Sequence, residues 1–457
     1  MKRLYITLLG ILLSVGAMAQ NPTTYFMEGS IVRNQWNAAF APQRGYVNIP
    51  AIGNIHVGMS GNTSLSDIIY NQNGTLSTIF SSAVPSSMAL ANLESVNTMG
   101  LDTRVNVVGF GAYRKDGKSF WSFDLNVRAN VDESLPYELF EFVKTGRETT
   151  FGGVNMGVES YIEAAFGYSF PITEKLYLGA RAKFLIGACR FRATIDNFTA
   201  QMNETHWYAD ANGRMEAWGA QMELSYDDLG NGYYDLDNLE DMKMKMPAGY
   251  GFGFDLGVTY DILPELQLSA SVNDIGAIFW SKSKSSIGYV DAKGMEYTGV
   301  HIDENGESTQ PTFDFEELTE AEALEQKGLT SPLRSSINVG AEYNFLDRRI
   351  GLRLLYTMHF YECKTRYNLT AAANFRPLKW LHLSGSYSFV GNRGSAIGLG
   401  LNICPSFINF FVGTDILFCK KSTDWMPVKE SIMNLTFGLG VHIGRRSLRG
   451  AESKITD

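Results

Sequence analysis

Apolar and polar residues alternate along most of this chain, in segments long enough to cross a lipid bilayer. In the segment 120–131, Trp121 and Phe123 fall on one face, whereas Asp124 and Arg128 fall on the other. Alternation with a period of two is typical of a β-strand that has one apolar and one polar face. The segments have about 9 to 15 residues, whereas a bilayer needs roughly 9–11 and most soluble strands have roughly 5–6. The pattern predicts membrane-crossing strands.

Fourteen such segments can be counted, and an even number is typical of bacterial outer-membrane barrels. They cover residues 53–61, 101–113, 119–131, 155–170, 175–190, 247–260, 266–279, 333–345, 350–361, 365–375, 381–390, 396–403, 408–418 and 431–443. A soluble sandwich or barrel would also alternate, but its apolar face would line a core. Here the polar faces are rich in Gly, Ser and Asn and carry both charges, as expected around a watery lumen. The chain, with 45 glycines and 12% aromatic residues, is predicted to be all-β: a transmembrane, antiparallel, up-and-down β-barrel of about 14 strands.

The connections between these segments alternate in length. The short ones are residues 114–118, 171–174, 262–265, 346–349, 376–380 and 404–407. The long ones are 62–100, 132–154, 191–246 and 281–332, and three shorter ones follow at 362–364, 391–395 and 419–430. Outer-membrane barrels have short periplasmic turns and longer extracellular loops. We therefore expect both ends of the barrel in the periplasm.

The first residues have the pattern of a secretory signal peptide. Lys2 and Arg3 precede the apolar run 4–15, and Ala17-Met18-Ala19 forms a cleavage site. Cleavage after Ala19 leaves an N-terminal periplasmic or lumenal segment (20–52), the barrel (53–443) and a periplasmic C-terminal tail (444–457) behind the signal peptide (1–19). No later segment has the pattern of a membrane helix. We expect the protein in the cell outer membrane.

The segment behind the signal peptide resembles the opening of a known family. It reads Arg33-Asn34-Gln35-Trp36-Asn37-Ala38-Ala39-Phe40-Ala41-Pro42, followed by Gly45-Tyr46-Val47-Asn48-Ile49-Pro50. This resembles a Bacteroidetes outer-membrane barrel family, domain of unknown function 5723, and more distantly the fatty-acid transporter FadL and related fourteen-stranded barrels. Those usually have Asn-Pro-Ala where this chain has Asn37-Ala38-Ala39. The resemblance implies an exported outer-membrane barrel and supplies neither a substrate nor catalytic residues.

No motif of a known catalytic or metal centre occurs in the sequence. Nucleophile elbow, zinc-protease helix, phosphate-binding loop and Cys-x-x-Cys pair are all missing, and the 6 His residues are scattered. The 4 Cys are too few for a disulfide scaffold, and the net charge of −9 argues against a nucleic-acid partner. We therefore expect no enzymatic activity, no cofactor and no metal. The expected partners are outer-membrane lipid, the barrel-assembly machinery and, if the barrel transports, a small-molecule solute.

Ten charged residues on the polar faces are predicted to point into the lumen. They are Asp124, Arg128, Glu159, Glu163, Arg181, Lys183, Asp255, Glu342, Arg353 and Asp415. A turn at 346–349 places Glu342 directly opposite Arg353. Glu163 falls opposite Arg181, or opposite Lys183 if its turn slips by one residue on each side. Such pairs either tie the wall together, at about 0.2–1 kcal/mol each, or line a polar pathway that selects solutes by charge. The mixture of signs favours the structural interpretation.

The long connections contain two helix-like signals and two acidic clusters. Residues 86–94 are helix-compatible, and the connection 62–100 is expected either to fold inward as a plug or to lie at the rim. Thr319-Glu320-Ala321-Glu322 is a capping box that predicts a short helix ending at Gly328. The acidic clusters at 227–241 and 303–328 indicate solvated loops rather than divalent-ion sites. Aromatic residues beside the short turns are expected to form a belt at the membrane interface. They are Tyr113, Trp121, Phe170, Tyr177, Tyr260, Phe345, Phe375 and Trp380.

The sequence leaves two functions open. The first is passive or facilitated uptake of a small apolar or amphipathic solute through the lumen. The alternative is a non-transport outer-membrane scaffold or surface-binding protein that acts through its extracellular loops. An occluded lumen would favour the second function, and a gap in the wall would favour the first.

Overall fold

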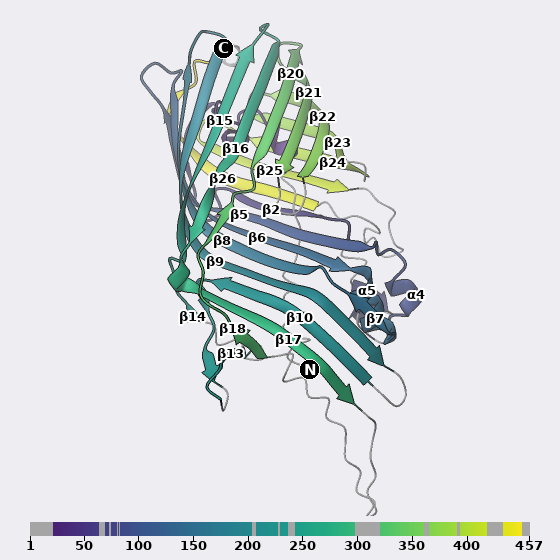
Figure 1. Cartoon of the computed structure of the whole chain (residues 1–457). Helices are drawn as coiled ribbons and strands as arrows, with labels where there is room; N and C mark the ends of the chain where they lie inside the picture. The colour runs from purple at the N-terminus through teal and green to yellow at the C-terminus, as the bar shows by residue number, and fades with distance from the viewer. Residues whose placement is uncertain are drawn as a thin grey trace, which may run out of the picture.

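A computed structural model describes most of the chain as one long, curved β-structure (Figure 1). The described residues are 22–63, 69–72, 75–79, 81, 83–202, 207–226, 229–235, 243–297, 320–360, 365–390, 394–417 and 433–449. The expected signal peptide, most of the acidic cluster 303–328 and the final residues 450–457 lie outside this range. No helix among the described residues is long and apolar enough to cross a membrane.

Fourteen antiparallel strands close into a barrel. The first is interrupted: β1 (Arg44–Asn48) and β2 (Ile55–Gly61) both pair with β5 on one side and with β26 on the other, which joins the two ends of the sheet. The other wall strands follow in chain order, each paired with the next. They are β5 (Val96–Tyr113), β6 (Phe120–Pro136), β8 (Val154–Pro171), β9 (Leu176–Met202), β15 (Gly249–Asp261), β16 (Leu266–Trp280), β20 (Ser336–Phe345), β21 (Ile350–Phe360), β22 (Thr365–Leu378), β23 (Leu381–Val390), β24 (Gly394–Ile403), β25 (Ile408–Leu417) and β26 (Met433–Arg446). The predicted all-β, fourteen-stranded barrel is confirmed.

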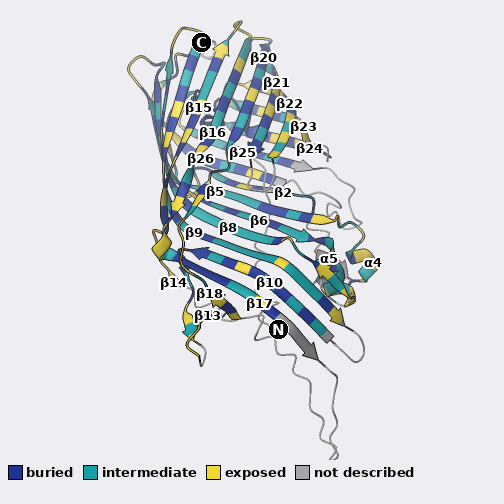
Figure 2. Ribbon diagram, in the orientation of Figure 1, coloured by how far each residue is buried: buried dark blue, intermediate teal, exposed yellow. Residues whose placement is uncertain are grey.

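The barrel is polar inside and apolar outside. Phe252 and Leu399 are 55% and 64% exposed, whereas Asp124 and Glu163 are each 2% exposed. Buried and exposed residues alternate along the wall strands (Figure 2). A soluble barrel would bury its apolar face, so this arrangement rules out the soluble alternative. An apolar outer surface around a polar interior is the arrangement of a transmembrane barrel.

One side of the barrel extends far beyond the other. We call the end with the short connections the turn end and the opposite end the loop end. β9 has 27 residues, whereas β23, β24 and β25 have 10 each. At about 3.3 Å per residue, β9 is on the order of 90 Å long. Its loop-end half pairs with β10 (Trp207–Trp218), which in turn pairs with β17 (Ser285–Tyr297).

Shorter elements surround this extended side. The strands β7 (Thr149–Phe151), β12 (Leu224–Tyr226), β13 (Gly232–Asp235), β18 (Glu320–Ala323) and β19 (Leu329–Pro332) belong to the same sheet. Two small sheets pair β3 (Ile69–Gln72) with β4 (Thr75–Thr78) and β11 (Ala220–Gln221) with β14 (Lys243–Met244). A 3-10 helix, η3 (Lys282–Lys284), lies between β16 and β17.

The described part of the connection 62–100 lies at the rim and not in the lumen. It contains α4 (Ser86–Ala89), which sits beside α5 (Tyr137–Thr145) at the loop ends of β6 and β8 (Figure 1). Ile79 and Ala89 pack with Phe140 of α5 and with Val131. Val131 lies on the same face of β6 as the exposed Val127, which is the outward face. Of the two placements expected for this connection, the rim is the one observed.

A strand replaces the helix expected from the capping box. Residues Glu320–Ala323 form β18, which pairs with β13 and β17. Ala321 is buried against Met215 and Tyr234. The local helix signal is weak, and the partner strands provide both backbone hydrogen bonds and burial, so the prediction is wrong.

The aromatic belt is also incomplete at two positions. Tyr260, Phe375 and Trp380 are exposed as expected. Tyr113 and Tyr177, however, are buried, and both face the guanidinium group of Arg449 inside the turn end. These two rings therefore do not face lipid.

Candidate functional site: the plugged lumen

Residues 22–42 lie inside the barrel, and we call them the plug. They contain α2 (Pro22–Tyr25) and the 3-10 helix η1 (Ile31–Gln35), and nearly all of them are buried. Ser30 caps η1, because its hydroxyl accepts a hydrogen bond from the N–H of Val32 at 3.3 Å. Trp36 Nε1 donates to Thr24 Oγ1 at 2.8 Å and so folds the segment back on itself.

Polar side chains of the wall hold much of the plug backbone. Asn374 Nδ2 donates to the carbonyl oxygen of Phe26 at 2.6 Å, and Ser271 Oγ donates to that of Trp36 at 2.7 Å. Buried backbone groups need hydrogen-bond partners, and a short irregular segment cannot supply enough of its own. The Asn and Ser residues on the inner faces of the strands supply them here. The polar lining therefore binds a segment of the chain.

Two glycines let the plug lie directly on the wall. Gly179 of β9 and Gly257 of β15 are paired opposite each other. A Cβ on Gly179 would overlap the carbonyl group of Ala38, and one on Gly257 would overlap Oδ1 of Asn37. Asn37 also donates through Nδ2 to the carbonyl oxygen of Ala270 at 3.1 Å. The segment Asn37-Ala38-Ala39 is thus a docking point of the plug.

Glu28, the only acidic residue of the plug, is held by three arginines of the wall. Arg348 and Arg353 contact its carboxylate oxygens at 2.5 and 3.1 Å, and Arg376 contacts it as well. Glu28 is 2% exposed. A buried carboxylate requires such pairing, because an unpaired buried charge is costly.

Arg33, the only basic residue of the plug, pairs with Glu342. Glu342 also contacts Arg353 at 3.2 Å. The two plug residues and their four wall partners, Arg348, Arg353, Arg376 and Glu342, form one buried group that we call the plug ion cluster. The wall register pairs Glu342 directly with Arg353, as the turn at 346–349 requires.

A second buried group, the central ion cluster, lines one side of the lumen. Lys183 Nζ contacts Asp255 at 2.7 Å and Asp274 at 2.5 Å. Arg128 contacts Asp274 at 3.0 Å and Glu163 at 3.2 Å. All five residues are at most 5% exposed. They come from five neighbouring strands and therefore tie this part of the wall together.

The remaining lumen residues expected from the sequence also have partners. Asp124 accepts a hydrogen bond from Arg181 at 3.0 Å. Glu159 pairs with Arg190 at 2.5 Å. Asp415 accepts a hydrogen bond from Thr23 of the plug at 2.6 Å. Among the described residues, no group of His, Cys, Asp and Glu is arranged to hold a metal ion.

The expected register of Glu163 is wrong. Glu163 lies opposite Leu185, and neither Arg181 nor Lys183 occupies that position. The turn is shifted along the chain, because Thr173 Oγ1 accepts hydrogen bonds from the N–H groups of Lys175 and Leu176, at 3.3 and 3.1 Å. Lys183 still reaches Glu163 diagonally at 3.8 Å.

Asp274 was missed by sequence reasoning. Residues 20–52 were expected as a periplasmic or lumenal segment, but Glu28 and Arg33 were not expected to contribute to the site. Strict alternation puts Asp274 on the lipid side with Leu268 and Val272, but a positive φ of 57° turns it inward. Its N–H donates to Asp255 Oδ1 at 2.7 Å. A charge in a row of apolar residues was the available signal for this irregularity, since lipid-facing charges are costly.

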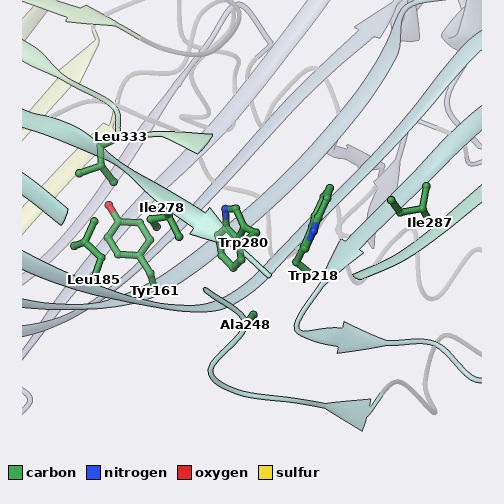
Figure 3. Packing of buried hydrophobic residues seen from close by; sticks show 8 residues of the cluster. All are labelled: Tyr161, Leu185, Trp218, Ala248, Ile278, Trp280, Ile287 and Leu333. Carbon is green, nitrogen blue, oxygen red and sulfur yellow. The ribbon is translucent and has the colours of Figure 1, made fainter. Parts of the chain in front are cut away.

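A cavity of about 400 Å³ opens at the loop end of the lumen. Its lining combines apolar residues such as Phe191 and Leu333 with the charged Glu159, Arg190 and Arg334. Leu333 also belongs to an apolar cluster that includes Tyr161, Leu185, Trp218, Ile278 and Trp280 (Figure 3). We call this cavity the vestibule.

The last described residues close the turn end. Arg449 donates to the carbonyl oxygens of Ala39 and Lys118 at 2.8 and 2.6 Å, and to Ser169 Oγ at 3.0 Å. Its guanidinium group lies 4.8 Å from the ring centre of Tyr177. The C-terminal tail thus links the plug to β8 and to the turn between β5 and β6.

A family model described as "Family of unknown function (DUF5723)" matches residues 38–415. The chain belongs to this family. The matched region begins at the plug's docking point and includes both ion clusters apart from Glu28 and Arg33 of the plug. None of the curated proteins is similar enough in sequence to match it.

Several solved barrels resemble the chain in outline. The toluene transporter TbuX of Ralstonia pickettii is 10% identical, with 94% of this chain and 95% of that chain covered and a TM-score of 0.46. A FadL homologue of Pseudomonas aeruginosa is 8% identical, with 93% and 98% covered and a TM-score of 0.48. The toluene transporter TodX of Pseudomonas putida is 8% identical, with 93% and 94% covered and a TM-score of 0.42.

Proposed function

We propose that this outer-membrane barrel takes up a small amphipathic solute and that the plug is its gate, with no enzymatic step. The observation that carries the proposal is the way the plug is held. It is a segment separate from the wall strands, and hydrogen bonds and ion pairs hold much of it in place. Polar partners of this kind can exchange for water. Apolar side chains of the plug, such as Met27 and Ile31, also pack with Phe411 of the wall. Plug movement therefore exposes apolar surface, which the apolar part of a solute can cover.

The vestibule supports an amphipathic solute. Its apolar residues Phe191 and Leu333 offer contact area for an apolar body. The ion pairs Arg190–Glu159 and Arg334–Asp132 in the same lining offer polar contacts for a polar head. Its volume of about 400 Å³ is in the usual range of small-molecule sites, about 300–1,000 Å³. Solute would enter at the loop end and meet the plug before reaching the turn end.

A second candidate function is that of a scaffold or surface-binding protein. It is favoured by the occluded lumen, in which buried ion pairs fix the plug, as expected for this function from the sequence. The long β9–β10–β17 side also favours it, because it presents a surface at the loop end. In that case the plug never moves and the lumen stays closed. The two functions therefore differ in whether plug movement controls permeability.

A reversible disulfide between the plug and the wall distinguishes these two functions experimentally. Thr23 Oγ1 and Ser386 Oγ lie 2.6 Å apart, so the double variant Thr23→Cys/Ser386→Cys, with the 4 native cysteines replaced by alanine, is expected to form a disulfide between plug and wall. We expect uptake of a fluorescent hexanoate derivative into proteoliposomes to stop on oxidation and to recover on reduction. Each single-cysteine variant is the control. Equal uptake in both states would show that the plug is not the gate, and no uptake even by the wild type would favour the scaffold.

We also propose that residues 1–19 are an export signal and that the turn end faces the periplasm. The short connections lie at that end, together with Arg449 and the entry of the plug. Epitope tags inserted at Asn305, outside the described residues, and at Asp116 check this orientation. We expect antibody on intact cells to label the tag at Asn305 and not the tag at Asp116. The reverse pattern would invert the topology.

A further inference from the structure

The wall part of the plug ion cluster is built around a carboxylate that belongs to the plug. Arg348 comes from the turn between β20 and β21, Arg353 from β21 and Arg376 from β22, and all three converge on Glu28. The wall itself positions Arg353, whose guanidinium donates to Asn344 Oδ1 at 2.9 Å. This part of the arrangement does not depend on Glu28.

The guanidinium groups of the three arginines favour an oxyanion as the ligand of this site. A guanidinium group presents fixed N–H donors that match the oxygens of a carboxylate or a phosphate. If Glu28 leaves, Arg348, Arg353 and Arg376 face the volume that its carboxylate occupied. Glu342 still pairs with Arg353, but three guanidinium groups then share a single carboxylate. Buried positive charge that is only partly compensated is unfavourable, so the vacated volume favours another anion.

The site can be approached from the turn end. Arg348 is the most accessible of the cluster, with 18% of its side chain exposed. It lines a small cavity of about 50 Å³ together with Arg33, Asp261 and Arg449. A cavity of this size admits only a few atoms, which fits a small anion.

We propose that Arg348, Arg353 and Arg376 form a carboxylate-binding site, which Glu28 fills in the closed barrel and a free carboxylate fills when Glu28 is absent. Glu28 is then an internal ligand of the wall, and a soluble carboxylate competes with plug closure. The proposal rests on a plug that can separate from the wall, as in the proposed function, and it does not require transport.

The test is rescue of a Glu28→Ala variant by acetate. The purified barrel in detergent is heated in increasing sodium acetate and, separately, in sodium chloride of the same ionic strength. We expect acetate to raise the unfolding temperature of Glu28→Ala in a saturable way, and chloride not to do so. Ligands that bind only the folded state stabilise it in this manner.

Two variants serve as matched controls. Glu28→Gln keeps the volume of the side chain and removes its charge, so it fills the site and acetate is expected to have no saturable effect. Glu28→Ala/Arg353→Met removes one of the guanidinium groups, and we expect the acetate affinity to fall at least about tenfold. Phosphate tests the assignment of the anion: a saturable effect of phosphate without one of acetate would overturn it.

A measurement on the native plug covers the case in which Glu28→Ala fails to fold. With the native cysteines replaced, Thr23→Cys reports plug opening by its rate of maleimide labelling. We expect acetate to accelerate labelling relative to chloride, and Arg353→Met to abolish that acceleration. Equal labelling in the two salts, or equal rescue of Glu28→Ala and Glu28→Gln, would overturn the site. Failure of uptake alone would overturn the proposed function and leave these binding results unchanged.

Discussion

Replacing Lys183 with methionine is expected to lower the free energy of unfolding by about 3–5 kcal/mol, the usual cost of removing one partner from a buried ion pair. Lys183 Nζ lies 2.7 Å from Asp255 and 2.5 Å from Asp274, and its side chain is 4% exposed. Methionine keeps most of the packing volume and removes the charge. Asp274 then keeps Arg128 as an ion-pair partner, whereas Asp255 loses its ion pair with Lys183.

The control is Lys175→Met, in the exposed turn that precedes β9. We expect it to change stability little, since surface substitutions are usually within about 0.5 kcal/mol. Urea unfolding of the barrel in detergent gives both values. Adding Asp255→Asn to Lys183→Met is expected to restore part of the loss, because it removes one uncompensated charge. Equal losses from the two lysine variants would mean that the central ion cluster does not stabilise the wall.

Replacing Gly179 and Gly257 together with alanine is expected to displace the plug while the wall stays folded. The two new methyl groups would overlap the plug at Asn37 and Ala38. Overpacking a well-packed site typically costs about 1–3 kcal/mol, and here the plug is the element that can yield. Neither glycine has a positive φ, so alanine fits the wall strands themselves.

Labelling of a cysteine at position 41 measures this displacement. In a background without native cysteines, Ala41→Cys is expected to react with maleimide faster in the Gly179→Ala/Gly257→Ala variant, with far-ultraviolet circular dichroism unchanged. Gly385→Ala is the matched control, because nothing lies within 4 Å of a Cβ at that position. An unchanged labelling rate would show that the plug does not rest on the glycine pair.

The membrane strands were predictable because lipid outside and water inside impose a strict period of two. The short turn between β20 and β21 fixes the register, which is why Glu342 could be placed opposite Arg353. Beyond the membrane there is no lipid to require an apolar outer face, so apolar and polar residues no longer alternate strictly. The loop-end half of β9 and its pairing with β10 were not foreseen for this reason. There the strand is specified by its partner, and the partner is distant in sequence.

The site was only half predictable for a related reason. The wall residues Glu342, Arg353 and Asp415 stand in alternating strands, whereas Glu28 and Arg33 stand in a short segment without periodicity. The sequence left the periplasm and the lumen open for residues 20–52, because no local pattern distinguishes these two placements. The segment has a single acidic and a single basic residue among several aromatic residues. This composition was the available signal that the segment could be buried.

The closing contacts of the barrel also bear on the order of its assembly. Arg449 and Ala39, which form a hydrogen bond, are 410 positions apart in the chain, and β26 completes the ring by pairing with β1 and β2. The plug comes first in the chain, yet it binds residues on β22, β24 and β25, close to the other terminus. Contacts between such distant residues carry the largest loop-closure cost. In a newly exported chain, the plug therefore lacks these partners until almost all wall strands have been exported. The pairing that closes the barrel likewise joins the first strand to be exported with the last.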